Sequence, residues 1–133
     1  MLDSTACIDF LKGKENIKAK LDEMNALLCI STVTLYEVSI GLERSRRLKS
    51  EERYNELFNQ WLQFLTSVQI FTLDVRAAEH SAKINDELEA NGKKIDDNDI
   101  LIMGIMKAND VDEIITRNPD HFNRVTGITA IPF

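Results

Sequence analysis

Three acidic residues that lie far apart in the chain stand where predicted strands give way to predicted helices. They are Asp3, Glu37 and Asp99, and each has a hydroxyl or amide side chain close by in the sequence. Ligands of parallel sheets bind beyond the carboxyl ends of the strands, so these three carboxylates can meet at one edge. A cluster of carboxylates that the protein itself does not neutralise calls for a bound divalent cation.

Carboxylate oxygens and retained water are the ligands that Mg²⁺ and Mn²⁺ prefer. Such an ion lowers the pKa of a bound water and stabilises charge on a phosphoryl oxygen. The sequence has no glycine-rich phosphate loop of the dinucleotide or Walker type, which argues against those nucleotide-binding classes. The acids therefore predict metal-assisted hydrolysis of phosphodiesters.

Each acid also has a simpler interpretation. Asp3 can cap the helix that follows it, and Glu37 can close a capping box with Thr34. Asp99 lies in a group of acids that suits the start of a helix. However, Glu37 and Asp99 both belong to apolar segments that head into the core, where an unpaired carboxylate is costly, so the simpler interpretations explain less together than singly.

The two histidines and two cysteines show no metal-ligand spacing. We expect His80 to lie at the surface or an interface, and His121 to fix a turn in a loop. Cys7 and Cys29 stand in apolar surroundings and are predicted to be reduced core thiols of a cytoplasmic protein.

Apolar periodicity and breakers predict strands that alternate with helices, which indicates an α/β fold with a mainly parallel sheet. Asn91-Gly92 is expected to end the helix over 75–90. The expected helices cover 5–11, 16–24, a segment from about 31–34 to 42, 51–67, 75–90 and 97–107; the expected strands cover 1–2, 27–30, 70–73, 113–116 and 128–131.

The length of 133 residues fits a single domain over 1–133. No apolar run is long enough to span a bilayer, and the start of the chain does not look like a signal peptide, so we expect no membrane partner. The net charge of −6 disfavours binding of nucleic acid by bulk electrostatics. One exception is a basic run at 44–53, which is either a solvated helix face or a contact for an acidic partner.

Four motifs in order carry a resemblance to a known family. They begin with Asp3-Ser4, continue with Thr32 through Tyr36-Glu37 to Gly41, then Ile95 through Asp99 to Ile102, and end with Ile115-Thr116-Arg117-Asn118 and Phe122. This set resembles the PIN-domain nucleases, and most of all the VapC-type toxins of toxin–antitoxin pairs. The resemblance spans nearly the whole chain, although 44–90 carries no family motif.

The resemblance implies a three-layer α/β/α domain that acts as a Mg²⁺- or Mn²⁺-dependent endoribonuclease, with RNA as substrate and a cognate antitoxin as partner. It assigns Asp3, Glu37 and Asp99 to the family's acids, with Asp3 and Asp99 as metal ligands and Glu37 either ligating the ion or orienting a metal-activated water. Asn118 stands where a fourth acid is often found, and Asp120 could replace it. We expect Ser4 and Thr116 to hydrogen-bond the ligands.

Two other classes stay open at this point. A catalytically inactive PIN-like module that binds RNA or protein is favoured by Asn118, and a receiver-like phosphoacceptor is disfavoured because Asp3 lacks an acidic neighbour. The apolar positions of the helices around Trp61 and His80 predict a homodimer, which would bury on the order of 1,200–2,000 Å² in total. The basic run would then line a groove for single-stranded RNA.

Overall fold

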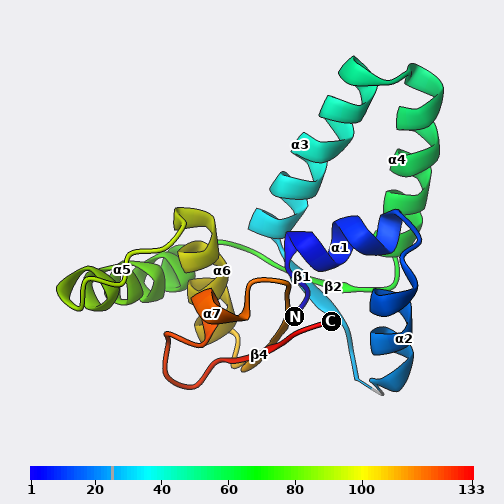
Figure 1. Cartoon of the computed structure of the whole chain (residues 1–133). Coiled ribbons are helices and arrows are strands. Elements are labelled where there is room, and N and C mark those ends of the chain that lie inside the picture. Colours follow the sequence, from blue (N-terminus) through cyan, green and yellow to red (C-terminus); the bar gives the residue numbers. More distant parts are fainter. Residues whose placement is uncertain (25) are drawn as a thin grey trace.

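The computed structural model describes residues 1–24 and 26–133 (Figure 1). Its helices and short strands alternate along the chain. The helices are α1 (Ser4–Leu11), α2 (Glu15–Glu23), α3 (Thr32–Leu48), α4 (Glu51–Leu65), α5 (Val75–Ala90), α6 (Asp97–Ala108) and α7 (Pro119–Phe122). The strands are β1 (Cys29–Ser31), β2 (Gln69–Phe71), β3 (Glu113–Ile115) and β4 (Thr129–Ile131).

The strands form two parallel pairs that the N-terminus connects. β1 pairs with β2, and β3 pairs with β4. Leu2 lies between the pairs: its amide donates to the Cys29 carbonyl at 2.8 Å, and it forms a parallel bridge with Ile115. The predicted first strand is thus a single bridging residue. The prediction of a mainly parallel sheet in an α/β fold is confirmed.

Side-chain caps explain where the main helices begin. Ser31 accepts from the Thr34 amide at 2.9 Å, so Ser31 is the N-cap of α3, which counts against the simpler interpretation of Glu37 as the partner of Thr34 in a capping box. Ser50 caps α4 in the same way, at 3.1 Å from the Arg53 amide. Beyond the C-terminal end of α5, Gly92 has a φ of 65°, a conformation that glycine adopts without strain. It ends the helix as predicted.

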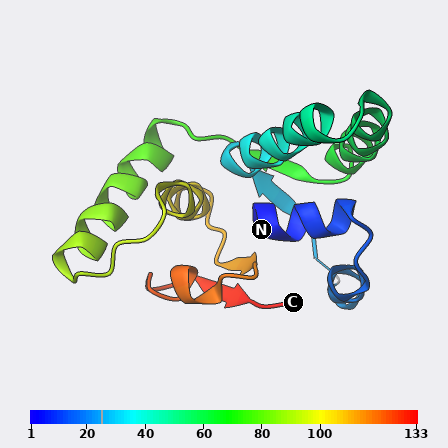
Figure 2. The same cartoon turned by 45° about the horizontal axis from the view of Figure 1, so that its top comes forward.

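Two hydrophobic clusters hold these elements together. One packs α5, α6 and α7 around buried residues such as Met103 and Phe122, and the other packs α1, α2, α3 and α4 around Leu2 and Trp61. In Figures 1 and 2, α3 and α4 form a helical hairpin that extends from the body, whereas α5 and α6 lie on the other side of the strands. The site described below lies where the two clusters meet.

The closest helix packing in this arrangement lies between α5 and α6. Ser81 of α5 is buried and its hydroxyl donates to the Ala77 carbonyl at 2.9 Å. Gly104 of α6 faces this turn so closely that a Cβ there would lie 2.6 Å from the Ala77 carbonyl oxygen and 2.8 Å from the Ser81 amide. Because α6 carries Asp99, this contact helps to fix the position of the Asp99 carboxylate relative to α5.

Several sequence predictions need correction. Leu27, expected in a strand buried on both faces, is 96% exposed and lies before β1, which begins at Cys29. Trp61 is buried against Phe64, with ring centroids 5.4 Å apart, so its own side chain does not add to the apolar surface of the helix expected to pair in a dimer. The short helix α7 was not predicted. Both cysteines are buried and free, as expected. Within 1–24 and 26–133, no helix has the length and apolar character needed to cross a bilayer.

Candidate active site

Asp3 lies at the end of the Leu2 bridge and is held by four hydrogen bonds. Its Oδ1 accepts from the Ala6 amide at 2.8 Å and from the Thr5 hydroxyl at 2.7 Å, while Oδ2 accepts from Thr5 at 3.0 Å and from Thr116 at 2.6 Å. Thr116 therefore contacts Asp3 as predicted, but Thr5 takes the place expected for Ser4. The residue is only 3% exposed, and burial raises the pKa of its carboxyl above the ordinary value despite these hydrogen bonds; Asp99 raises it further.

Asp99 lies in the first turn of α6, whose N-cap is Asp96. Its Oδ2 lies 2.6 Å from Nδ1 of His121 on α7. Burial raises the pKa of the Asp99 carboxyl, His121 opposes that rise, and the nearby carboxylates of Asp96 and Glu37 add to it. Asp99 is therefore the electrostatic link among acids that come from separate parts of the chain.

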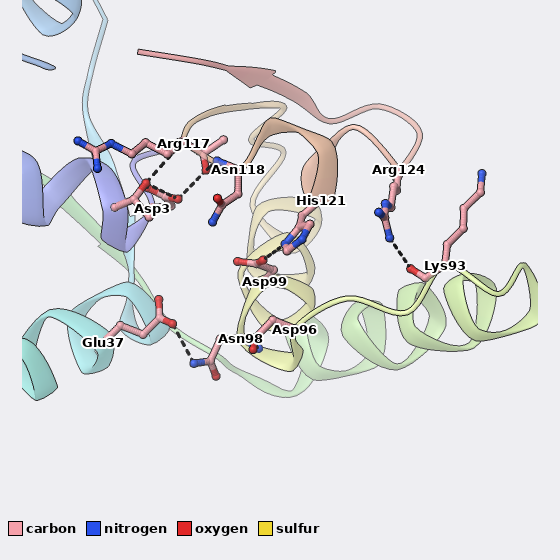
Figure 3. Close-up of polar contacts among 12 residues, drawn as sticks. Asp3, Glu37, Lys93, Asp96, Asn98, Asp99, Arg117, Asn118, His121 and Arg124 are labelled. Carbon is pink, nitrogen blue, oxygen red and sulfur yellow. Dashed lines mark hydrogen bonds and ion pairs between the residues drawn. The ribbon is translucent and has the colours of Figure 1, made fainter. Parts of the chain in front are cut away.

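Glu37 projects from the second turn of α3 towards the start of α6. Its Oε1 accepts a hydrogen bond from Nδ2 of Asn98 at 2.9 Å, across 61 positions of sequence. In Figure 3, Asp3 lies above Glu37, Asp99 lies to the right of both, and Asn98 lies below Asp99 with its bond to Glu37 dashed. The bond to Asn98 uses one carboxylate oxygen, so the other remains for a water or an ion.

The donor set fits a magnesium-type ion with few protein ligands. Among the described residues, no three side chains of His, Cys, Asp or Glu already form a metal cluster. Mg²⁺ is commonly bound by one or two carboxylates together with waters and substrate phosphates, and does not need a complete protein cage. Asp3 and Asp99 offer carboxylate oxygens as metal ligands, and Asp99 lies near enough to Asp3 to raise the pKa of the Asp3 carboxyl. A divalent cation between them would relieve the repulsion of the two carboxylates.

The structure does not give Asn118 and Asp120 equivalent positions. Figure 3 places Asn118 between Asp3 and Asp99; its amide nitrogen in the backbone donates to the Thr116 hydroxyl at 2.9 Å, and its side chain does not cap α7. Asp120 is exposed in the first turn of α7. Asn118 is thus well placed beside the acids, whereas nothing brings Asp120 into contact with them within the described part of the chain.

Two contributors to this edge were missed by sequence reasoning. Asp9 of α1 is 2% exposed and pairs with both Lys14, at 3.1 Å, and Arg117. The Arg117 amide also donates to the Thr5 hydroxyl at 3.1 Å, so this ion pair anchors the segment that carries Thr116 and Asn118. In the sequence, only the apolar neighbours Ile8 and Phe10 indicated that Asp9 lies on a buried face of the helix.

His121 is the other missed residue. The sequence prediction gave it a role in fixing a turn, because no partner stood at a recognisable spacing. Its contact with Asp99 joins residues 22 positions apart and depends on how α7 packs on α6. A single histidine beside Phe122 in a polar loop gave no signal of that packing.

Comparisons with known proteins show the family and the fold of this chain. The sequence model of the PIN domain matches residues 1–128. A tRNA(fMet)-specific endonuclease VapC from Salmonella typhimurium is 30% identical over 129 residues, which are 96% of this chain and 92% of the relative. The ribonuclease VapC2 of Haemophilus influenzae is 27% identical over the same shares of both chains.

Solved structures show the same fold. A DNA-bound VapBC from Salmonella typhimurium superposes with a TM-score of 0.81 and 26% identity, covering 99% of this chain and 96% of that one. VapBC2 from Rickettsia felis, bound to a promoter fragment, gives a TM-score of 0.84 at 23% identity over 100% and 97% of the two chains. The ordered acids, the parallel strands and these matches together establish that the chain belongs to the PIN domain family.

Proposed function

We propose that this protein is a VapC-type endoribonuclease that hydrolyses RNA phosphodiesters with a bound Mg²⁺ or Mn²⁺. The observation that carries the proposal is the convergence of Asp3 and Asp99, whose carboxylates interact although 96 positions separate them. Asp3 is buried, and the partly buried carboxylate of Asp99 raises the pKa of the Asp3 carboxyl further; such a pair is poor for stability and suitable for holding a cation. The VapC relatives, which are named as endonucleases or ribonucleases, support RNA as the substrate class.

The side chains divide the work by position. Asp3 and Asp99 would hold the ion, and Thr116 keeps Asp3 oriented by its 2.6 Å hydrogen bond. Glu37, fixed through Asn98, would orient the attacking water with its second oxygen. When bound, the ion supplies an activated water and stabilises negative charge on the phosphoryl oxygens. Asn118 is drawn between Asp3 and Asp99 in Figure 3, which supports a role in which its amide would contact the ion's waters or the scissile phosphate.

The second part of the proposal is that the protein is the toxin of a toxin–antitoxin pair. The structural relatives include VapBC structures and a toxin–antitoxin complex from Klebsiella pneumoniae. We expect a cognate antitoxin to bind this chain, and a homodimer to form. Exposed apolar side chains on α3 and α5, such as Tyr36 and Val75, supply surface for these contacts.

The basic run is less free to bind RNA than its sequence suggests. Arg46 pairs with Glu51 at 2.7 Å, and Arg53 pairs with Glu56 at 2.8 Å. Arg44 and Arg47 remain as candidate phosphate contacts, because both line a shallow surface hollow on α3 that also includes Tyr36. These two arginines are therefore the better targets for a test of RNA affinity.

Cleavage of RNA by the purified protein tests the central claim. The assay compares Mg²⁺, Mn²⁺ and EDTA for the wild type, Asp99→Asn and a matched control, Asp97→Asn. Asp97 lies on the same first turn of α6 but is exposed. We expect metal-dependent cleavage that Asp97→Asn keeps and Asp99→Asn loses by at least two orders of magnitude. Equal activity of the two variants, or full activity in EDTA, would contradict the proposal.

The partner claims have separate tests. The protein encoded beside this one, added in equimolar amount, should form a stable complex and inhibit cleavage. Light scattering of the isolated chain should give about twice the chain mass of 15.2 kDa. A strict monomer at tens of micromolar would refute the dimer while leaving the nuclease assignment intact.

A further inference from the structure

We propose that His121 is the positioning residue of the active site, and that it holds Asp99 ready for the divalent ion. This inference rests on the proposed function, since it concerns the same site. The imidazole Nδ1 lies 2.6 Å from Oδ2 of Asp99, the length of a strong charge-assisted hydrogen bond. Figure 3 shows the ring directed at this carboxylate from α7, on the side of Asp99 away from Glu37.

The imidazole is not needed to fix the turn around α7. Phe122 is fully buried and anchors the helix in the core, while the His121 backbone amide donates to the Asn118 carbonyl at 3.2 Å. The Asn123 amide closes the turn on the Pro119 carbonyl at 2.9 Å, and its side chain accepts from Ala130 at 3.1 Å. These contacts hold α7 in place, so the contact of the ring with Asp99 serves the site.

The surroundings make this contact specific. In the part of the chain that the structure describes, the ion pairs include only one basic group on the acids of the site, and that group is His121 on Asp99. The carboxylates of Asp96 and Glu37 also lie near Asp99, and His121 is the group whose contact opposes their charge. The side chains of His121 and Asp99 are 36% and 16% exposed, so both stay partly accessible to an ion and its waters.

The geometry assigns different tasks to the two oxygens of Asp99. A carboxylate accepts hydrogen bonds, so Nδ1 carries the proton and donates it to Oδ2. Oδ1 takes no part in this hydrogen bond, so it would be available to an ion held by Asp99 and Asp3. Hydrogen bonds to a ligating carboxylate orient it, and their removal commonly costs roughly 10–100-fold in metal affinity.

The test measures Mn²⁺ binding by calorimetry, in the absence of RNA, for the wild type and three variants. His121→Ala removes the donor and should weaken binding by roughly 10-fold or more. His121→Asn should recover most of the affinity, because its amide nitrogen can occupy the place of Nδ1. His80→Ala is the control, since the chain has only two histidines and His80 lies on α5, away from the acids.

Circular dichroism and thermal unfolding show whether each variant is folded, and His121→Asn covers the case in which the alanine variant is not. Unchanged Mn²⁺ affinity in folded His121→Ala would overturn the inference. Tighter binding would also overturn it, because His121 would then compete with the ion. The proposed nuclease function fails by a different readout: wild-type protein that binds Mn²⁺ but leaves RNA intact refutes that function, while the affinity series still decides the role of His121.

Discussion

The glycines of two helices provide a sharp test of the packing that positions Asp99. Gly104 of α6 and Gly41 of α3 are both interior helical residues, and Gly→Ala at such positions normally stabilises a helix by about 0.5–1 kcal/mol. At Gly41 nothing lies within 4 Å of an added Cβ, so that gain should be realised. At Gly104 the same methyl group would meet Ser81 and the backbone of Ala77.

The magnitude follows from which atoms must move. An added Cβ at Gly104 would lie 2.6 Å from a backbone carbonyl oxygen and 2.8 Å from a backbone amide, both closer than packed atoms tolerate. A side-chain rotation of Ser81 relieves only its hydroxyl, so α5 and α6 must separate. Such overpacking costs roughly 1–3 kcal/mol. After the helix gain is subtracted, we expect Gly104→Ala to lower the free energy of unfolding by about 1–2 kcal/mol.

Urea unfolding and thermal melts of both variants, without metal, decide the question. Each kcal/mol corresponds to a melting-temperature shift of roughly 2–8 °C, so Gly104→Ala should melt clearly below the wild type and Gly41→Ala at or above it. The Gly104 variant should also bind Mn²⁺ more weakly, because a shift of α6 displaces Asp99. Equal stabilisation by both substitutions would show that α5 and α6 are not in the close contact described here.

Three further predictions concern the charges of the site. Folding raises the pKa values of the Asp3 and Asp99 carboxyls, so the folded state binds more protons than the unfolded state above about pH 4. The metal-free protein should therefore lose stability as the pH rises through the folded pKa values. In thermal melts across pH, Asp99→Asn should reduce the dependence of the melting temperature on pH. Glu37→Gln keeps an oxygen that accepts the Asn98 hydrogen bond, so the free energy of unfolding of this variant should change by less than about 1 kcal/mol. RNA cleavage by the same variant should fall by orders of magnitude. Near-normal cleavage would show that Glu37 only links α3 to α6. Arg117→Ala leaves the buried Asp9 paired with Lys14 alone, so the free energy of unfolding measured in urea should fall by about 1–3 kcal/mol. A change below about 0.5 kcal/mol would show that the ion pair is dispensable for stability.

Local sequence patterns were sufficient for most of the secondary structure. The prediction for α5 matched its observed bounds, because the capping Asp74 and the Asn91-Gly92 stop act within a few residues of the helix. The strands were found within one or two residues, except that Leu27 extended the apolar run before β1 without being buried. A short apolar run contains no information about which of its residues a neighbouring strand will cover.

The acids of the proposed site were chosen by residue type and order in the sequence, because a group of carboxylates without a protein cation has few other uses. Their hydrogen-bond partners were not predicted so well. Thr116 was expected beside Asp3, but Thr5 was not, and the Asn98 bond to Glu37 crosses from α6 to α3. Such contacts depend on the angle at which two helices meet, and single-sequence periodicity does not specify that angle.

The sequence by itself therefore determined the parallel α/β architecture and the family, and it pointed to Asp3, Glu37 and Asp99 as the acids of the proposed site, since each of these inferences depends on residue type, local order or short-range periodicity. Only the tertiary structure decided that His121 contacts Asp99 and that Arg117 pairs with Asp9. These contacts join residues 22 and 108 positions apart, and they exist because buried groups such as Phe122 and Leu2 lock the surrounding elements in one arrangement. Long-range side-chain pairing is a consequence of that packing, so it becomes visible only when the chain is folded.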